Sequence, residues 1–423
     1  MLFYSKGSEK TAIDSIELKE IVFSVLSKLG KRNKVLVIPP DYSRYHSRAG
    51  EITRFVWQYY GKSLTDILPA LGTHAPMSEK ELTDMYGDVP KKLFRVHDWR
   101  KDLITLGEVP GSYIENISEG KVKYSWPAQV NKILVEGKYD LILSIGQVVP
   151  HEVVGMANYN KNVFVGTGGQ EGINKSHFLG AVYGMERMMG RIDTPVRKML
   201  NYAGEHFAKD LPLVYIQTVI GRNETGCLDQ RGMYAGDDAE CFKLAAELSQ
   251  KVNFQVLEKP LKKVVCYLDP KEYKSTWLGN KSIYRTRMAI ADKGELIVLA
   301  PALNEFGEDK EIDRLIRKFG YIGTPGVLNA VKENEELRNN LSAAAHLIHG
   351  SSEGRFTVTY CPGNLSEEEI LKANFNFAPL DKMLKIYNPE KLKDGYNTVE
   401  GEEFFYISNP ALGLWASKER FKN

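Results

Sequence analysis

The sequence has little net charge, few cysteines and no long apolar run. Its 56 Lys and Arg are balanced by 54 Asp and Glu, so it lacks the basic excess typical of nucleic-acid-binding proteins. The four cysteines form no CxxC pair, which argues against a disulfide scaffold and a zinc ribbon. No run approaches the roughly 18–20 apolar residues of a membrane-spanning helix, and we expect no secretory signal. These absences favour a soluble, cytoplasmic protein.

The length of the chain predicts more than one domain. At 423 residues, with 43% hydrophobic and 26% charged residues, it is too long for a single core. We expect an N-terminal α/β domain over residues 1–260 and a C-terminal α/β domain over 261–405. An active-site cleft is expected between them, and a tail over 406–423 is expected to dock back on the first domain.

Apolar runs alternate with helical patterns in the first domain. The runs at 34–39, 66–72 and 139–146 are nearly continuous, as in strands of a sheet that is covered on both faces. A helix is expected after Ser78, with Glu81 completing a capping box. Strands that alternate with helices predict an α/β fold with mostly parallel sheets.

The second domain shows the same alternation. Strands are expected at 263–269 and 294–301, with a helix at roughly 280–291 between them. Further helices are expected at 309–319 and 335–348, and a long helix at 237–252 precedes the domain boundary.

In open α/β sheets, ligands bind beyond the carboxyl ends of the strands. The loop after 34–39 contains Asp41, Ser43 and Arg44, which suit a hydroxylated anionic ligand or, alternatively, a turn with a surface ion pair. The loop after 66–72 contains His74, just before a helix, where a neutral imidazole is favoured as a base. A structural role for His74 is the alternative.

The loop after 139–146 begins with His151 and continues into a glycine-rich stretch. Five glycines between 155 and 172 permit close backbone approach to a ligand, although the spacing fits neither Walker A nor GxGxxG. The apolar residues at 163–165 favour a buried, ordered segment over a flexible loop. Lys161 and His177 lie in or just after this stretch.

Three histidines are therefore expected on one rim of the sheet. His74, His151 and His177 form either a zinc set or an acid/base pair with a third residue for a metal, and spacing leaves both possibilities open. We expect His97 and His206 to face solvent, and His346 and His349 to have packing or surface roles.

The loop motifs together resemble those of the lactate racemase family. They are Asp41-x-Ser43-Arg44, the Gly-Thr-His-x-Pro-Met stretch around His74, and the ordered series of His151, Lys161 and His177. The resemblance extends from about residue 10 to 415. It implies a 2-hydroxy acid racemase or epimerase that uses the nickel-pincer nucleotide, a nicotinate-derived mononucleotide that binds nickel through two sulfurs and a ring carbon.

The resemblance also implies residue roles. Lys161 matches the lysine that tethers the cofactor covalently, and His177 matches the imidazole that completes the nickel coordination. His74 and His151 match the two catalytic histidines, which handle the hydroxyl proton while hydride moves between the α-carbon and the cofactor through a 2-keto acid. The loop of Asp41, Ser43 and Arg44 matches the segment that contacts the cofactor.

The chain departs from the family pattern in the second domain. Lactate-specific members carry Tyr-Gln-x-x-Lys, where this sequence has Tyr284, Arg285 and Arg287. We expect an arginine to bind the substrate carboxylate, and a larger or more acidic 2-hydroxy acid than lactate. The expected partners are that substrate and the cofactor-maturation enzymes, with no nucleic acid and no membrane. Two alternatives are a non-catalytic ligand-binding or regulatory homologue and a zinc-dependent hydrolase that uses the same histidines.

Overall fold

The computed structural model describes residues 1–421, which form two compact units. The first unit comprises Met1–Leu179 and Gly190–Asn253, and the second comprises Gly180–Met189 and the chain from Phe254 onward. Each unit contains a six-stranded sheet in which most neighbouring strands are parallel. The predicted α/β fold class with mostly parallel sheets is confirmed.

The sheet of the first unit has the strand order β1-β10-β9-β6-β2-β3. Its strands are β1 (Leu2–Gly7), β2 (Val35–Ile38), β3 (Leu64–Ile67), β6 (Leu141–Gln147), β9 (Leu213–Arg222) and β10 (Leu228–Gly236). The four strands from β9 to β3 run parallel, and β10 and β1 extend the sheet in antiparallel fashion. All four residues of β2 are buried, which explains its unbroken apolar run.

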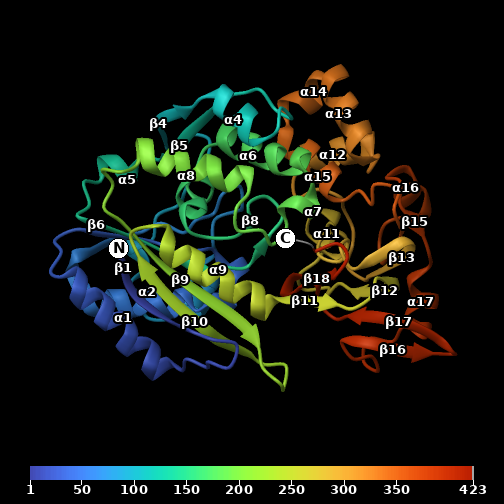
Figure 1. Cartoon of the computed structure of the whole chain (residues 1–423), viewed down its shortest axis with the longest axis horizontal. Helices are drawn as coiled ribbons and strands as arrows, with labels where there is room; N and C mark the ends of the chain where they lie inside the picture. The colour runs from blue at the N-terminus through green and yellow to red at the C-terminus, as the bar shows by residue number, and fades with distance from the viewer. Residues whose placement is uncertain (422–423) are drawn as a thin grey trace. The chain divides into compact units, whose positions relative to one another are not determined.

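Helices cover both faces of this sheet. Long helix α9 (Ala239–Asn253) lies over β9 and β10 (Figure 1). Helices α1 (Ser15–Leu29) and α2 (Ala49–Tyr60) share a hydrophobic core with the opposite face. The unit also contains α3 (Glu79–Tyr86), α4 (Gly111–Ile117), α5 (Ile133–Glu136), most of α6 (Gln170–Tyr183), α8 (Pro195–Phe207), and the strand pairs β4 (Leu103–Val109) with β5 (Trp126–Asn131) and β7 (Pro150–His151) with β8 (Gly155–Met156).

The sheet of the second unit has the order β15-β14-β13-β12-β17-β16. Its strands are β12 (Leu261–Tyr267), β13 (Ile290–Ala300), β14 (Thr357–Pro362), β15 (Asn376–Phe377), β16 (Gly395–Val399) and β17 (Glu402–Ile407). A separate parallel pair joins β11 (Phe254–Leu257) to β18 (Leu414–Ser417), so the C-terminal strand pairs within the second unit. The helices are α7 (Met185–Met188), α10 (Thr276–Gly279), α11 (Lys281–Tyr284), α12 (Lys310–Phe319), α13 (Gly323–Glu333), α14 (Glu335–Asn339), α15 (Leu341–His349), α16 (Glu367–Lys372) and α17 (Leu380–Ile386).

Two predicted helices are wrong in extent. The helix expected at 280–291 is reduced to α11, because the backbone of Arg285 and Met288 bonds to the β18 segment instead of continuing a helix. The helix expected at 335–348 is divided at Asn340, whose side chain accepts a hydrogen bond from the Ala343 amide and starts a new helix. In contrast, the predicted capping box of Ser78 and Glu81 is confirmed at the start of α3.

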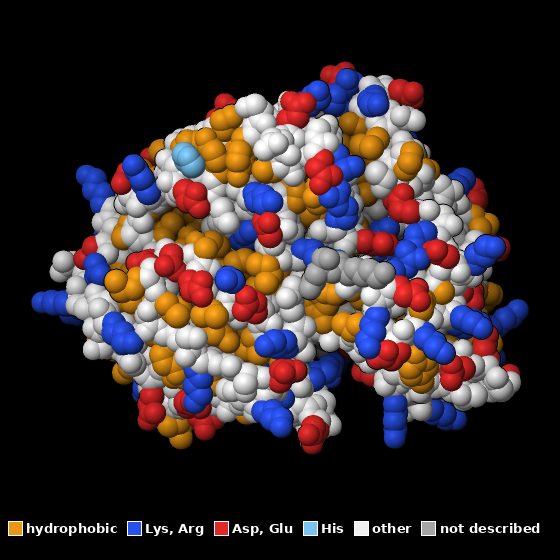
Figure 2. Space-filling model, viewed as in Figure 1, with side chains coloured by type: hydrophobic (Ala, Val, Ile, Leu, Met, Phe, Trp, Pro, Cys, Tyr) orange, Lys and Arg blue, Asp and Glu red, His pale blue; other side chains and the backbone are white. Residues whose placement is uncertain are grey.

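The surface reflects the balanced composition. Figure 2 shows Lys and Arg interspersed with Asp and Glu over the face drawn. Within residues 1–421, no helix has both the length and the apolar character needed to cross a membrane.

Candidate active site

Three loops leave the same edge of the first sheet. Strands β3, β2 and β6 are parallel neighbours in the sheet, so their carboxyl ends lie side by side. The loop after β2 contains Asp41 and Arg44, the loop after β3 contains His74, and the segment after β6 contains His151. The edge predicted from the sequence therefore brings these loops together.

Asp41 and His74 form a hydrogen-bonded pair across two of these loops. The Nδ1 atom of His74 lies 2.5 Å from Oδ2 of Asp41, which is 8% exposed. The Ser43 hydroxyl donates to the other carboxylate oxygen. Burial on its own would raise the pKa of Asp41, but the bonds from His74 and Ser43 outweigh it and lower that pKa. The ionised carboxylate fixes the proton of neutral His74 on Nδ1 and leaves Nε2 as a base.

His151 is held in the opposite tautomer. The Val153 amide donates to Nδ1 over 3.1 Å, so the proton of neutral His151 lies on Nε2. The Glu152 carboxylate lies 3.8 Å from the same Nδ1 atom. Burial lowers the pKa of His151 well below its usual 6.5, and the positive charges of Lys161 and Arg44 lower it further. His151 is therefore neutral at pH 7 and presents an N–H group.

Lys161 lies between two unusual backbone segments. Asn158 and Tyr159 precede it with φ of 68° and 59°, and a π-helical turn at Asn162–Gly166 follows it. Burial, together with the charge of Arg44, lowers the pKa of Lys161 to about 8. No hydrogen bond or ion pair formed by residues 1–421 engages its amine. Less of the amine is therefore protonated near neutral pH than in an ordinary lysine, although most of it still carries its proton at pH 7.

His177 lies on α6 with one ring nitrogen occupied. Its Nδ1 atom is 2.7 Å from the Ile173 carbonyl and donates to it, which leaves the lone pair of Nε2 free for a metal. Burial is the main cause that lowers the pKa of His177 to about 4, and the charges of Lys161 and His74 contribute. These electrostatic effects place His177 in the same group of residues.

Arg44 adds a second cation without a partner among the described residues of the site. Its guanidinium forms no hydrogen bond or ion pair with residues 1–421, yet its charge lowers the pKa of His151 and Lys161. It is therefore available for a carboxylate or phosphate. We refer to the whole group as the carboxyl-end cluster, comprising Asp41, Ser43, Arg44, His74, His151, Lys161 and His177.

The described residues of this cluster do not form a metal site of three or more protein ligands. Across the described residues, no group of three or more His, Cys, Asp or Glu side chains is arranged to hold a metal ion. The zinc set of three histidines considered from the sequence is therefore not formed. Nε2 of His177 could serve as one ligand to a metal whose other ligands come from a bound group.

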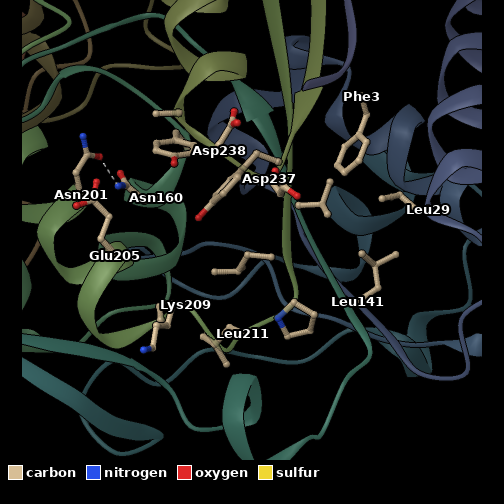
Figure 3. A pocket seen from close by; sticks show the side chains of 18 of the residues that line it. Phe3, Leu29, Leu141, Asn160, Asn201, Glu205, Lys209, Leu211, Asp237 and Asp238 are labelled. Carbon is tan, nitrogen blue, oxygen red and sulfur yellow. Dashed lines mark hydrogen bonds between the residues drawn. The ribbon is translucent and has the colours of Figure 1, made fainter. Parts of the chain in front are cut away.

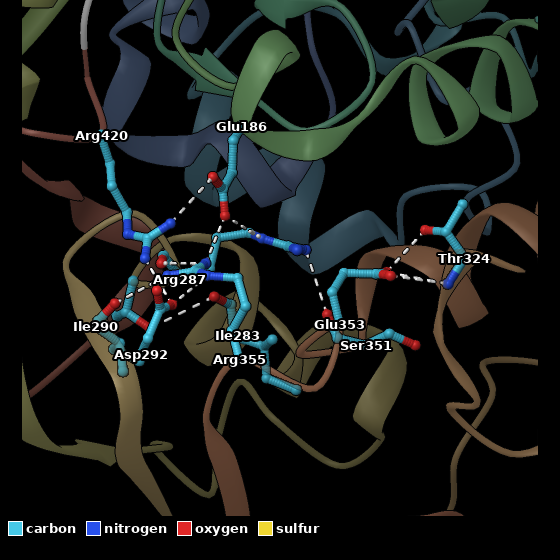
Figure 4. Close-up of polar contacts among 11 residues, drawn as sticks. Glu186, Ile283, Arg287, Ile290, Asp292, Thr324, Ser351, Glu353, Arg355 and Arg420 are labelled. Atoms are coloured by element: carbon cyan, nitrogen blue, oxygen red, sulfur yellow. Dashed lines mark hydrogen bonds and ion pairs between the residues drawn. The ribbon is translucent and has the colours of Figure 1, made fainter.

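The predicted substrate residues are buried in the second unit. Arg287 is 4% exposed, and its guanidinium lies 3.6 Å from Glu186 and 3.3 Å from the Ser351 carbonyl. Figure 4 shows that Arg355 and Arg420 also approach Glu186. Arg285 and Tyr284 are likewise buried, and Arg285 donates to the Gly413 carbonyl over 3.4 Å. Arg287 therefore faces a carboxylate inside this unit, which it shares with Arg355 and Arg420.

One structural histidine was assigned incorrectly from the sequence. His97 was expected to face solvent, but it is buried, with its ring nitrogens 2.9 Å from the Gly168 carbonyl and 3.0 Å from Asn131. It supports the backbone just before α6, which carries His177. Its segment has no regular secondary structure, so no periodicity in the sequence signals its burial. Glu152 was also not singled out, because only the fold shows its distance to His151.

Comparisons with known proteins agree with the fold and with the first-unit motifs. Residues 5–189 match the family described as the lactate racemase N-terminal domain. A protein from Thermotoga maritima has a crystal structure that is similar, with a TM-score of 0.81 and 24% identity over 98% of this chain and 100% of that chain. The lactate racemase apoprotein from Thermoanaerobacterium thermosaccharolyticum is similar, with a TM-score of 0.71 and 16% identity over 96% of this chain and 93% of that chain. No curated protein matches the chain significantly. The predicted resemblance to the lactate racemase family is thus confirmed over residues 5–189, and the fold of the chain is similar to that of a lactate racemase.

Proposed function

We propose that the protein is a racemase or epimerase of a 2-hydroxy acid that uses a nickel-pincer nucleotide tethered to Lys161. The observation that carries this proposal is the unpaired amine of Lys161 in the carboxyl-end cluster. In the same cluster, His74 and His151 are held in opposite tautomers. Inversion at one carbon needs one group that accepts the hydroxyl proton and another that donates to the same oxygen.

Four residues of the cluster would hold the nucleotide. Lys161 would form the covalent link, and Nε2 of His177 would bind the nickel. The unpaired guanidinium of Arg44 and the hydroxyl of Ser43 would contact its phosphate end. When bound, the nucleotide supplies an acceptor for the hydrogen on the substrate α-carbon, which gives a planar 2-keto acid.

The two remaining histidines would move the hydroxyl proton. In the resting tautomers, Nε2 of His74 accepts this proton, and Asp41 stabilises the imidazolium that results. The Nε2–H group of His151 donates a hydrogen bond to the substrate oxygen. The His74 imidazolium would return the same proton to the oxygen when the 2-keto acid is reduced again, so the proton balance closes while Nδ1 of His151 continues to accept from the Val153 amide.

The second unit would supply the contacts that select the substrate. Tyr284 and Arg285 are proposed to recognise its carboxylate side, and Arg287 acts with them through the charge cluster around Glu186. Arginine in place of the lactate-specific Gln and Lys supports a bulkier or more acidic 2-hydroxy acid. The protein would receive its cofactor from maturation enzymes in the cytoplasm.

A non-catalytic ligand-binding homologue is the second candidate. The internal pairing of Arg287 with Glu186 favours it, because this arginine already contacts a carboxylate within the second unit. The two functions differ in their need for Lys161.

The protein should be produced together with cofactor-maturation enzymes, and its nickel content and peptide masses should be measured. Stoichiometric nickel and a mass adduct on Lys161, both absent from Lys161→Ala, are expected for the racemase. Racemase activity without nickel or adduct would overturn the proposal.

A further inference from the structure

Arg197 is a buried cation without an acidic partner. It lies on α8, it is 2% exposed, and no ion pair among residues 1–421 includes it. Burial lowers the pKa of its guanidinium to about 9, so the group remains charged at neutral pH. A buried charge without a counter-ion is unfavourable unless polar groups surround it. The contacts of this guanidinium therefore indicate what it is for.

Those contacts converge on the segment just before Lys161. The two terminal nitrogens of Arg197 donate to the carbonyls of Met156, over 2.7 Å, and Asn158, over 3.3 Å, and to the side-chain oxygen of Asn160. The guanidinium carbon also lies 4.2 Å from the ring centroid of Phe242. One side chain thus binds three points of a five-residue stretch that ends next to the lysine.

This stretch has a backbone conformation that needs support. Asn158 and Tyr159 are consecutive non-glycine residues with positive φ, a conformation that the Cβ atom disfavours. Such a turn persists only where surrounding contacts determine it. The bonds from Arg197 to the Met156 and Asn158 carbonyls and to the Asn160 side chain meet that need, because they hold the chain before, within and after the turn as it enters Lys161.

Helix α8 presents two more residues to the same stretch. Thr194 and Asn201 lie three positions before and four positions after Arg197, which places all three on one face of the helix. The Thr194 hydroxyl donates to the Val154 carbonyl over 3.1 Å. The side-chain amide of Asn160 donates to the side-chain oxygen of Asn201 over 2.7 Å. Figure 3 shows the latter bond at the wall of a pocket of about 660 Å³. Since open space borders the stretch there, packing alone does not hold Asn160.

We propose that Arg197 is a positioning residue for Lys161, acting by locking the left-handed turn at Asn158 and Tyr159. This inference rests on the proposed role of Lys161 as the cofactor-linking lysine. Loss of the guanidinium would release the turn and let the amine move toward solvent. The charge of Arg197 also disfavours a charged Lys161 nearby, in agreement with the same role.

The test measures the amine of the cofactor-free full chain, so it needs no assumption about the cofactor. Wild type, Arg197→Met and Arg197→Lys would be acetylated with acetic anhydride across pH 6–11, and the Lys161 peptide would be quantified by mass spectrometry. Arg231→Met is the matched control, because Arg231 is also buried in the first unit and also donates to two backbone carbonyls, those of Thr11 and Arg222. Asn201→Ala removes one contact to the same stretch and disturbs the core less.

In Arg197→Met, the pH midpoint for labelling of Lys161 is expected to rise by about one unit or more from the wild-type value near 8. Arg197→Lys should recover part of that shift, Asn201→Ala should show a smaller rise, and Arg231→Met should show none. An unchanged midpoint in folded Arg197→Met would overturn the inference. If that variant does not fold, an unchanged midpoint in both Arg197→Lys and Asn201→Ala would overturn it. A shifted midpoint with no adduct in the matured wild type would instead contradict the proposed function alone.

Discussion

His74 and Asp41, which are 33 residues apart in the chain, are joined by a 2.5 Å contact between Nδ1 and Oδ2. The pair exists because β2 and β3 are parallel neighbours whose following loops leave the same edge of the sheet. It turns two ordinary loop residues into an oriented base. A second histidine, His151, is oriented by a backbone amide instead of a carboxylate. The two imidazoles therefore differ in tautomer although their chemistry is the same.

Replacing Asp41 by Asn should impair catalysis more than folding. The amide oxygen can still accept a hydrogen bond, but it no longer stabilises the imidazolium of His74. We expect the rate of enantiomer interconversion to fall about 10³-fold, the size of effect that follows loss of an orienting carboxylate. Circular dichroism and the Lys161 adduct should be unchanged. Asp66→Asn is the control, since Asp66 on β3 pairs with Arg95 and Tyr139 outside the carboxyl-end cluster and should affect stability only. Wild-type rates for Asp41→Asn would refute the assigned role.

Replacing Arg44 by Gln should raise the pKa of Lys161. Burial is the main reason why that pKa lies near 8, and the positive charge of Arg44 lowers it further. Without this charge, less free amine is present at pH 8, so acetylation of Lys161 should slow by about 3-fold to 10-fold. Arg54→Gln, on α2, should leave the rate unchanged. Equal or faster labelling of Arg44→Gln would show that the two charges do not interact.

The free energy of unfolding of the cofactor-free protein should fall on mild acidification. Burial lowers the pKa of His46 and His177 to about 4, and that of His151 well below 6.5. The unfolded chain therefore binds protons near pH 6.5 that the folded chain cannot bind until about pH 4. Within this window, stability declines as pH falls, by up to about 1.4 kcal/mol per pH unit for each histidine.

Urea denaturation at pH 7 and pH 5 measures this decline. The variant His46→Asn should show a shallower dependence on pH, because one titrating group is removed. His206→Asn should leave the dependence unchanged, since that side chain is exposed. Equal stability of the wild type at the two pH values would contradict the assignment of neutral, buried histidines.

Replacing Glu186 by Gln should destabilise the second unit. Glu186 lies 3.6 Å from buried Arg287 and 2.5 Å from Arg355, so the substitution leaves buried positive charge uncompensated. We expect a loss of about 3 kcal/mol in the free energy of unfolding. Glu368→Gln removes an ion pair with Lys372 in which both side chains are exposed. This substitution should have no measurable effect on the free energy of unfolding. If Glu186→Gln lowered the free energy of unfolding no more than Glu368→Gln does, the Glu186 cluster would add nothing to stability.

The strands and loops of the first unit could be predicted from the sequence because their signals are local. Apolar runs that are buried on both faces mark β2 and β6, and polar residues directly after them mark the ligand edge. In contrast, the helix expected around Arg285 is cut short by pairing with β18, more than 120 residues later, and no local pattern signals that competition. Helix propensity was overridden by tertiary hydrogen bonds.

The supporting residues of the site could not be predicted for a similar reason. Arg197 and His97 act through backbone carbonyls of segments far away in the sequence, and their own neighbours carry no motif. Glu152 stands next to His151 in the chain, but its distance to Nδ1 depends on the turn that follows. Motifs identify the groups that react, whereas the contacts that orient them depend on the folded backbone.

The central claim is that this chain inverts a 2-hydroxy acid through a group bound to Lys161. The most direct measurement incubates the matured protein with single enantiomers of 2-hydroxy acids that carry deuterium on the α-carbon, followed by chiral separation and mass analysis. Both enantiomers should appear with the deuterium retained, since the hydrogen moves as hydride, and Lys161→Ala should leave the starting enantiomer unchanged. Inversion by Lys161→Ala, or inversion with the deuterium lost to water, would contradict the account.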